Sequence, residues 1–402
     1  MLVFEAKLEG KNEQYERLDE AIRTARFIRN SCIRYWMDTK KDVGRYDLSA
    51  YCVVLAKEFP WAAKLNSMAR QASAERAWSA IARFFDNCKK ARPGKKGFPR
   101  FKKHETHGSV EYKTCGWKLS EDRRNITFTD GFKAGSFKLW GTRDLHFYQL
   151  NQIKRVRVVR RADGYYVQFC IDAERNEKRE PTGRTIGLDV GLTHFYTDSD
   201  GNTVENPRYL RKSERSLKKL NRRLSKTQKG SKNRVKARNR LSRKHLKVSR
   251  RRKDFAVKLA RCVIQSNDLV AYEDLSVRNM VKNRKLSKSI SDAAWTAFRN
   301  WVEYFGKVLG VATVAVPPHY TSQNCSNCGK VAKKSLSQRT HICPHCRFVL
   351  NRDWNAARNI LELGLRTVGH TGTSNASGDI DLCLGEETPS NKSGRRKRKP
   401  KQ

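Results

Sequence analysis

Two pairs of cysteines in the last quarter of the chain constrain its fold more than any other feature. The pairs are Cys325–Cys328 and Cys343–Cys346, each with two residues between its members, and fourteen residues separate the pairs. Two such pairs supply four thiolates for one tetrahedral zinc ion, a closed ligand set with a structural role. Four unrelated cysteines rarely take this spacing, and two copies so close together disfavour a redox function. We therefore predict a zinc module here.

The other cysteines and two nearby histidines are not needed for this site. The remaining seven cysteines lie singly along the chain, which favours a reducing compartment without disulfides. His341 and His345 fall inside the module, but the four thiolates complete the ligand set without them. We expect both histidines to lie at the surface or to contact nucleic acid.

The chain is strongly basic. Of its 402 residues, 85 are Lys or Arg and 40 are Asp or Glu, which leaves a formal charge of +45. Such a charge repels itself unless a polyanion neutralises it, and nucleic acid is the obvious partner. A basic surface that is merely hydrated is the simpler alternative. The charge is concentrated, however, because residues 208–253 hold 22 Lys or Arg and a single acid, Glu214.

We expect neither a signal peptide nor a membrane span. The first residues contain acids and no apolar stretch. The longest apolar run, near residues 308–316, is far shorter than a helix that crosses a bilayer. Together with the scattered cysteines, this predicts a cytoplasmic protein bound to nucleic acid.

The first half of the chain reads as strands interrupted by helices. Residues 2–9 alternate as a strand does, a helical pattern begins near Tyr15, and a second helix is predicted from about Met68 to Asn87. A basic segment rich in Pro and Gly, residues 89–103, is predicted to be a loop or an extended arm. Strand patterns then dominate residues 110–172, with Asp163-Gly164 as a tight hairpin turn. This order predicts a β-barrel interrupted by a helical domain.

The second half begins with a different pattern. The sequence TIGLDVGLTHFYTDSDGNTVE (185–205) reads as three short strands joined by turns. The basic segment 208–253 is predicted to form two helices with a turn at residues 229–234. A strand at 268–275, a helix over 293–310 and a strand at 311–318 follow. A last helix is predicted from Asp353 to about Leu365.

Three carboxylates occupy matching positions in these elements. Asp189 ends the apolar strand TIGLD, Glu273 ends the apolar strand LVAYE, and Asp353 opens the last helix. Each has an ordinary explanation as a turn residue, a hydrated strand end or a helix cap. Together they can converge on one point and bind Mg²⁺, which prefers oxygen ligands. In so basic a chain they predict an RNase H-like nuclease core in which two Mg²⁺ ions assist phosphodiester hydrolysis.

An ordered set of motifs resembles one family of nucleases. The segments IGLDVG, AYEDL, SISDAAW, TSQNCSNCGK, QRTHICPHC and NRDWNAARNI resemble the RuvC domain and zinc ribbon of TnpB proteins. These proteins are encoded by insertion sequences and are related to type V CRISPR nucleases. The resemblance extends forward to KKGFPRFKK and the first strand and helices, so it covers nearly all of residues 1–368. No single motif is specific, but the ordered set is.

The resemblance implies a multidomain α+β fold. A RuvC α/β core would carry an inserted zinc ribbon, and a β-barrel wedge domain would be interrupted by a helical recognition domain. The implied divisions are: wedge domain, 1–10 and 100–180; recognition domain, 11–99; RuvC domain, 184–318 and 350–368, with the basic insertion 208–253; zinc ribbon, 319–349; and a disordered basic tail, 369–402.

The resemblance also implies an activity. The protein would bind a guide RNA derived from the end of its own element, recognise a short motif beside a double-stranded DNA target, and cut both strands. Its catalytic acids and magnesium ligands would be Asp189, Glu273 and Asp353, and its zinc ligands the four cysteines. The family often carries an acid where this chain has Asn351, which leaves a supporting contact open. A monomer in a prokaryotic cytoplasm, associated with the nucleoid, is expected.

Four residues are candidates for contacts with nucleic acid. Gln71 resembles a residue of the family's motif-reading helix, and glutamine can bond to adenine through two hydrogen bonds; a surface glutamine is the alternative. Lys96, Arg100 and Lys102 of the Pro/Gly-rich arm are expected to contact phosphates. The basic segment 208–253 is the main candidate for backbone contacts, with a hydrated helical hairpin as the alternative.

Three other functions fit parts of the sequence. A nuclease-inactive relative would act as an RNA-guided DNA-binding regulator or a transposition accessory protein, but the three acids are retained. A DNA-joining transposase is disfavoured because no tyrosine or serine recombinase pattern is visible. A structural RNA-binding protein would have no need of the carboxylates.

Overall fold

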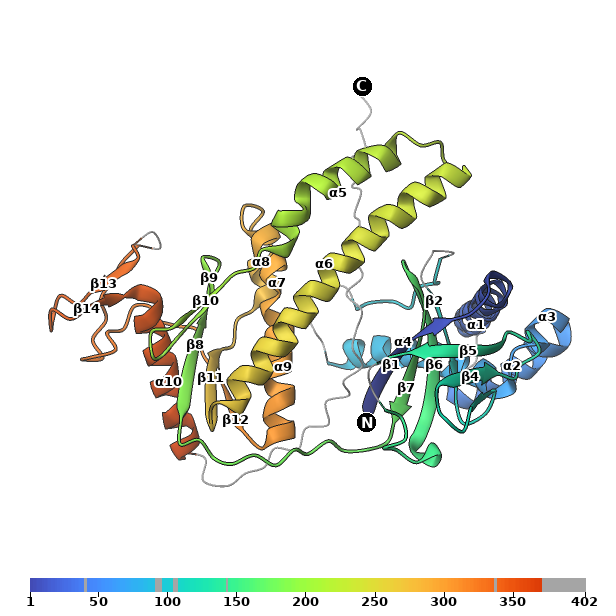
Figure 1. Cartoon of the computed structure of the whole chain (residues 1–402), viewed down its shortest axis with the longest axis horizontal. Coiled ribbons are helices and arrows are strands. Elements are labelled where there is room, and N and C mark those ends of the chain that lie inside the picture. The colour runs from blue at the N-terminus through green and yellow to red at the C-terminus, as the bar shows by residue number, and fades with distance from the viewer. Residues whose placement is uncertain (40–41, 91–95, 104–107, 142–143, 336–337, 371–402) are drawn as a thin grey trace.

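The computed structural model describes residues 1–39, 42–90, 96–103, 108–141, 144–335 and 338–370. The chain forms two bodies, each with its own sheet, joined by an extended segment and crossed by one long helix (Figure 1). Residues 371–402, which include most of the predicted tail, lie outside the described residues. Among the described helices, none is both long enough and apolar enough to cross a membrane.

The first body begins with one strand and a group of helices. The predicted strand at residues 2–9 and the helices near Tyr15 and Met68 are confirmed, while one further long helix was not predicted. The elements are β1 (Leu2–Glu9), α1 (Asn12–Asp38), α2 (Arg45–Glu58), α3 (Pro60–Ala63) and α4 (Ser67–Lys89). The unpredicted helix, α2, buries Leu48, Cys52 and Leu55, which are spaced as one helical face.

An antiparallel seven-stranded sheet completes this body. Its strands are β1, β2 (Gly108–Tyr112), β3 (Trp117–Leu119), β4 (Asn125–Phe128), β5 (Gly135–Trp140), β6 (Ile153–Arg161) and β7 (Gly164–Ile171), with a short 3-10 helix at Leu150–Gln152. The predicted hairpin joins β6 to β7, and Gly164 takes a φ of 139° that suits glycine. One hydrophobic core runs from the sheet into the helices.

The sheet is open in the described residues, where the sequence predicted a barrel. Its strand order is β2-β6-β7-β1-β5-β4-β3, and no ladder joins the edge strands β2 and β3 in the part of the chain that the structure describes. Helices α1 and α4 pack against β2 instead. The side chain of Ile22 on α1 lies so close to Gly108 that a Cβ there would be 2.4 Å away. The helices thus cover the β2 side of the sheet.

The second body contains a mixed five-stranded sheet in the order β10-β9-β8-β11-β12. Its strands are β8 (Thr185–Val190), β9 (His194–Asp198), β10 (Thr203–Glu205), β11 (Leu269–Glu273) and β12 (Ala312–Val316). Strands β8, β11 and β12 run parallel, and β9 and β10 form an antiparallel edge. Helices cover both faces, which is typical of an α/β fold.

Long helices cover the two faces of this sheet, and short helices connect β11 to α9. The helices α6 (Lys232–Gln265) and α9 (Trp295–Leu309) pack on one face, and α10 (Arg352–His370) packs on the other. The short helices α7 (Val277–Met280) and α8 (Ser287–Ala293) connect β11 to α9. Two short strands, β13 (Thr340–Ile342) and β14 (Val349–Asn351), lie next to the start of α10 (Figure 1).

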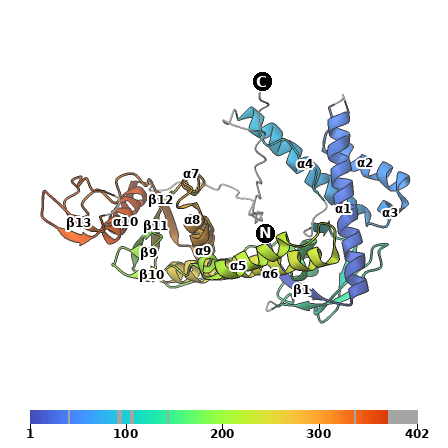
Figure 2. The ribbon, with the colours of Figure 1, turned by 90° about the horizontal axis from the view of Figure 1, so that it is seen from above.

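The basic segment forms a helical hairpin. Its helices are α5 (Tyr209–Ser225) and α6, and Ser231 caps α6 by accepting a bond from Arg234 N at 3.1 Å. The turn covers residues 226–231 and so overlaps the predicted turn at 229–234, and α6 continues to Gln265. The hairpin extends away from the second body and passes beside the first (Figures 1 and 2). Arg250 on α6 bonds to Asp163 at 2.6 Å and to the Tyr166 hydroxyl at 2.7 Å, which ties it to the β6–β7 turn.

Candidate active site

Side-chain alternation places two of the three carboxylates on one face of the second sheet. On β11, Val270 and Tyr272 pack toward α6 and α9, whereas Leu269 and Ala271 pack toward α10. Successive side chains of a strand point to opposite faces. Glu273 therefore lies on the α10 side, two residues beyond Ala271.

The same argument places Asp189. On β8, Ile186 and Leu188 pack toward α6 and α9, so Gly187 and Asp189 face α10. Gly187 and Ala271 are register partners in neighbouring parallel strands. Asp189 and Glu273, each two residues further on, are thus adjacent at the carboxyl ends of these strands.

Small residues let α10 approach this face closely. A Cβ on Gly187 would lie 2.3 Å from the Ala357 carbonyl, and a Cβ on Gly364 would lie 2.5 Å from the Ala271 side chain. The helix therefore lies almost directly on the two strands. Asp353 stands one helical turn before Ala357, toward the strand ends, because residues four apart share a helix face. The first turn of α10 thus brings the third carboxylate to the other two.

The first turn of α10 is held by Asn351. Its side-chain oxygen accepts hydrogen bonds from Asp353 N at 2.9 Å and Trp354 N at 3.3 Å, which is the geometry of a helix N-cap. Asparagine and aspartate cap equally well. In this chain Asn351 therefore supports the backbone of Asp353.

Asp189 is the least compensated of the three carboxylates. Burial raises its pKa well above the usual value, and the charges of Glu273 and Asp353 raise it further. No described residue forms a hydrogen bond or ion pair with its carboxylate. A half-buried carboxylate beside two others disfavours its own ionised form unless a cation is supplied.

The other two carboxylates have partners. Burial raises the pKa of Glu273, while the Thr321 hydroxyl lowers it by donating a hydrogen bond to Oε1 at 2.5 Å. Asp353 lies 3.5 Å from Arg339 and from Arg352. Arg339 also reaches Thr193, just after β8, at 3.5 Å. Its guanidinium thus spans one side of the carboxylate group, a contact that the sequence analysis did not identify.

The carboxylates are more widely spaced than the ligands of a single closed ion site. In the part of the chain that the structure describes, only the four cysteines bring three or more possible ligand atoms within 4.8 Å of one another. The chemistry of the carboxylates nevertheless suits magnesium, which takes few protein oxygens and keeps several waters. A divalent cation here would also relieve the repulsion at Asp189.

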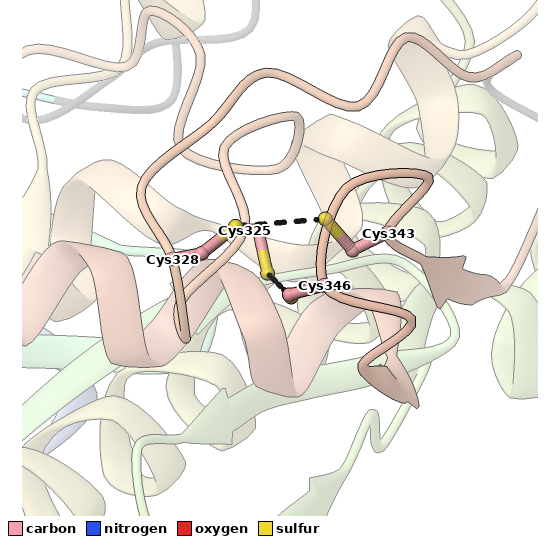
Figure 3. Close-up of side chains that lie close together, drawn as sticks. All are labelled: Cys325, Cys328, Cys343 and Cys346. Carbon is pink, nitrogen blue, oxygen red and sulfur yellow. Dashed lines mark hydrogen bonds between the residues drawn. The ribbon is translucent and has the colours of Figure 1, made fainter.

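The four cysteines form a compact cluster, as predicted (Figure 3). Their Sγ atoms approach across the two pairs, Cys325 to Cys346 and Cys328 to Cys343, each at 3.6 Å. Tetrahedral zinc with bonds of about 2.3 Å would place its sulfurs about 3.8 Å apart. The cluster therefore indicates a structural zinc site.

Two asparagines join this cluster to α10. Asn355 donates to the Asn324 carbonyl at 2.7 Å and accepts from Ser326 N at 2.9 Å. Asn359, one turn later, donates to the carbonyls of Thr321 and Asn324 at 2.7 and 2.8 Å. Both side chains are buried. Their spacing of four residues on a predicted helix was a signal that sequence reasoning did not use.

The prediction for His341 was wrong. Its ring is fully buried, and its Nδ1 lies 2.5 Å from the Lys334 ammonium. Burial, with the charge of Lys334, lowers the pKa of His341, so the neutral ring accepts this contact. The histidine is a packing residue of the module because β13 turns it inward, whereas His345 is exposed as expected.

The four candidate nucleic-acid contacts do not form one group. Gln71 is exposed near the start of α4. The arm lies against the far end of that helix, where Asn87 donates to the Lys96 carbonyl at 3.2 Å. Asn87 lies sixteen positions after Gln71, so at about 1.5 Å per residue the two are roughly 24 Å apart along the helix. Gln71 is thus well separated from the arm.

The described part of the arm, residues 96–103, is fixed on α1 through Arg100 and Lys102. Arg29 donates to the Arg100 carbonyl at 3.2 Å. Asn30 both accepts from Lys102 N and donates to its carbonyl, each at 2.9 Å. The side chains of Arg100 and Lys102 are exposed, and Lys96 is half-buried.

The basic hairpin is anchored by an acid that the sequence analysis did not interpret. Asp292, in the SISDAAW segment, accepts bonds from Leu210 N at 2.9 Å and Arg211 N at 3.1 Å at the start of α5. It also pairs with Arg252 on α6 at 2.9 Å. One buried carboxylate therefore fixes the base of both helices.

Comparisons with known proteins support the motif resemblance. Residues 168–284 match a family described as "Probable transposase", the OrfB family of IS605 elements. Residues 295–360, which include the four cysteines and Asp353, match the Cas12f1-like TNB domain.

Relatives and a solved structure extend the similarity over most of the chain. A "Putative RNA-guided DNA endonuclease" of Streptomyces pristinaespiralis is 30% identical over 371 residues, covering 90% of this chain and 89% of that protein. The InsQ protein of Escherichia coli K12, with the same description, is 30% identical over 283 residues, covering 66% of this chain and 68% of that protein. A Cas12f1 chain solved with guide RNA and target DNA covers 87% of this chain and 83% of its own, with a TM-score of 0.53 at 17% identity, which shows a shared fold. The chain therefore belongs to the TnpB family, whose relatives are named RNA-guided DNA endonucleases.

Proposed function

We propose that the protein is an RNA-guided endonuclease that hydrolyses double-stranded DNA beside a short adjacent motif. The observation that carries the proposal is the convergence of Asp189, Glu273 and Asp353 at one edge of the second sheet. Three carboxylates gathered in a protein with 45 excess positive charges suit a cation-dependent reaction on a polyanion.

The carboxylates would act as magnesium ligands. Two bound Mg²⁺ ions would activate the attacking water and stabilise the leaving oxygen of the phosphodiester. Asp189 and Glu273 lie on rigid strand ends and Asp353 on a capped helix turn, so their positions are set before substrate arrives. Arg339, which lies beside Asp353 and is 58% exposed, is placed to contact a phosphate at the same edge.

The partners would be a guide RNA and target DNA. Base pairing would select the sequence, while the protein holds the backbones in cationic surfaces. The α5–α6 hairpin offers one such surface, since most of its Lys and Arg side chains are exposed. Gln71 would read the adjacent motif, and Lys96, Arg100 and Lys102 would contact phosphates.

The two bodies correspond to two sets of proposed domains. The first, with its sheet and helices, would comprise the wedge domain (1–10 and 100–180) and the recognition domain (11–99). The second would comprise the nuclease domain (184–318 and 350–368) and the zinc ribbon (319–349).

Cleavage of a programmed plasmid tests the proposal. The protein is expressed together with the end of the insertion element that would encode its guide RNA, and the copurifying RNA is sequenced. A plasmid library that carries the matching target beside randomised sequence is then digested in Mg²⁺. Asp189→Asn, Glu273→Gln and Asp353→Asn should each reduce cleavage at least about a thousandfold, since metal ligands contribute several kcal/mol. Binding of RNA and target should persist.

Asp274→Asn is the matched control. Asp274 neighbours Glu273, but its side chain is 65% exposed and pairs with Arg299 at 2.5 Å. This variant should cut normally. Wild-type protein that binds guide and target but never cuts would instead identify a regulator, and normal cutting by the Asp189, Glu273 and Asp353 variants would refute the site.

A further inference from the structure

Thr321 lies near the start of the zinc ribbon (319–349), next to the carboxylate group. Its side chain is buried, with 3% of the residue exposed. The hydroxyl donates to Glu273 Oε1 at 2.5 Å, and the Pro318 carbonyl is 3.4 Å away. The shorter contact marks Glu273 as the main partner of this hydroxyl.

The backbone around Thr321 is fixed from two sides. Val316, five residues earlier, is the register partner of Glu273 on the neighbouring strand. Tyr320 takes the left-handed conformation with a φ of 63°, which turns the chain back toward the sheet. The Thr321 carbonyl then accepts a bond from the buried Asn359 amide at 2.7 Å.

The same amide reaches the zinc module. Asn359 also donates to the Asn324 carbonyl at 2.8 Å, and Asn324 directly precedes Cys325. A path of hydrogen bonds thus runs from Asn324, beside the first cysteine pair, through Asn359 and Thr321 to Glu273. Each link is made by a buried or half-buried group.

We propose that Thr321 is a positioning residue that orients the Glu273 carboxylate for metal binding and couples it to the zinc module. By holding Oε1, the hydroxyl fixes the rotation of the carboxylate and leaves Oε2 to face the cation. Partners of this kind, which hold a metal ligand in place, typically change metal affinity or activity by 10- to 100-fold when they are removed. This inference rests on the proposed nuclease function.

Valine and serine substitutions separate positioning from packing. Thr321→Val keeps the shape and removes the hydroxyl, whereas Thr321→Ser keeps the hydroxyl and removes a methyl group. Thr24→Val, at a buried threonine in α1, is the control for loss of a buried hydroxyl elsewhere. All are prepared as complexes with guide RNA and loaded with zinc.

Mn²⁺ is the probe for the site, measured by electron paramagnetic resonance. Guide RNA binds Mn²⁺ in every complex. The Mn²⁺ ions that bind to wild type but not to the Glu273→Gln complex are therefore the ions of the carboxylate site. Thr321→Val should weaken their binding roughly tenfold and raise the Mg²⁺ concentration for half-maximal cleavage by the same factor. Thr321→Ser should stay within about twofold of wild type. Zinc content and guide RNA binding should not change.

A double variant tests whether Thr321 acts through Glu273. In the Glu273→Gln background, Thr321→Val should cause no further loss. Wild-type Mn²⁺ binding by Thr321→Val, or equal losses in the Val and Ser variants together with loss of zinc, would overturn the inference. If Glu273→Gln itself changed neither Mn²⁺ binding nor cleavage, the active site on which the proposed function rests would be refuted instead, and the two failures are thereby distinguishable.

Discussion

At the scale of single residues, the candidate active site is held in an electrostatically unfavourable state. Asp189 has two carboxylate neighbours and no partner of its own among the described residues. The surrounding fold, including the close contact of Gly187 with α10, holds these groups together despite their repulsion. Binding sites for cations commonly store such repulsion, because the bound ion relieves it.

This repulsion predicts how metal-free stability depends on pH. Burial and the neighbouring carboxylates raise the pKa of Asp189, and burial raises that of Glu273. The folded protein then binds protons more tightly than the unfolded chain, whose carboxyl groups titrate near 4. Stability contributed by these two groups is therefore present below about pH 4 and is lost as pH rises through the raised folded pKa values.

Thermal unfolding between pH 4.5 and 8 measures this effect. In Mg²⁺-free buffer without chelator, so that zinc is retained, Asp189→Asn should unfold at a higher temperature than wild type at neutral pH, by roughly 2 °C per kcal/mol gained. The difference should shrink at low pH and disappear or reverse in Mg²⁺. Asp274→Asn should follow wild type throughout. A lower Tm for Asp189→Asn in Mg²⁺-free buffer would contradict the account.

At the scale of elements, the zinc module supports the first turn of α10. Asn324, which precedes the first cysteine pair, is bonded to Asn355 and Asn359 on that helix, and Ser326 within the pair is bonded to Asn355. Arg339, between the two pairs, contacts Asp353 at 3.5 Å. Loss of zinc should therefore disturb Asp353, a candidate catalytic carboxylate, without removing any of its own contacts.

Metal analysis and a cysteine variant test this support. The protein should contain about one zinc per chain, and Cys325→Ser should lose it, lower the Tm and reduce cleavage. Hydrogen exchange should show faster exchange in the first turns of α10, because the module no longer fixes them. Cys88→Ser, at an exposed cysteine, should behave as wild type. A zinc-free protein with full stability and activity would rule out the structural role.

The α5–α6 hairpin makes a separate prediction about affinity. Five exposed cations are suited to substitution with Gln because none has an ion pair among the described residues: Lys219, Arg222, Arg223, Lys236 and Arg240. Their removal should weaken nucleic-acid binding for all sequences and flatten its salt dependence, by roughly one unit of log–log slope for each phosphate that the protein no longer neutralises. Motif choice should stay the same, since backbone contacts position and base contacts specify.

Gln71→Ala is the complementary variant. It should change which adjacent motif is preferred and leave the salt slope nearly unchanged. Affinity is measured against salt concentration for both proteins, on matched DNA and on DNA with an altered motif. A hairpin variant that switched motif preference while keeping its salt slope would show that the division between α4 and the hairpin is wrong.

At the scale of the whole molecule, the fold leaves much of its charge uncompensated. Among the described residues, α6 joins the two bodies through Arg250, bonded to Asp163 and Tyr166, and through Arg243, bonded to the Ala162 carbonyl. A long cationic hairpin passes along them (Figure 2). An RNA ligand would neutralise this charge and bridge both bodies.

Guide RNA should therefore stabilise the protein strongly. A ligand that binds only the folded form adds about 4 kcal/mol at a thousand times its Kd. RNase treatment of the purified complex should lower the Tm by several degrees and promote precipitation, and fresh guide RNA should restore both. A tRNA of similar length, tested at physiological salt, should restore less. Equal behaviour with and without RNA would count against an RNA partner.

Much of this organisation is local and could be read from the sequence. The zinc ligands follow from cysteine spacing, and the order of strands and helices follows from hydrophobic periodicity. The three carboxylates stood out because each ends a strand or starts a helix. The turn between the basic helices was also partly correct, since Gly230 and Ser231 interrupt a helical pattern within it. These signals depend only on neighbours within a few residues.

Contacts between segments that are distant in the sequence were decided only by the tertiary structure. The burial of His341, the open first sheet, the arm fixed on α1 and the bond from Thr321 to Glu273 depend on which surfaces meet after folding. None of these contacts produces a repeating pattern in the sequence. Each depends on a single hydrogen bond or a single close approach, whereas a helix or strand repeats its pattern over many residues. The sequence by itself determined which groups could bind metal and nucleic acid. The packing of α10 on Gly187 and Ala271 decided that three of these groups, Asp189, Glu273 and Asp353, lie together at the carboxyl ends of neighbouring strands.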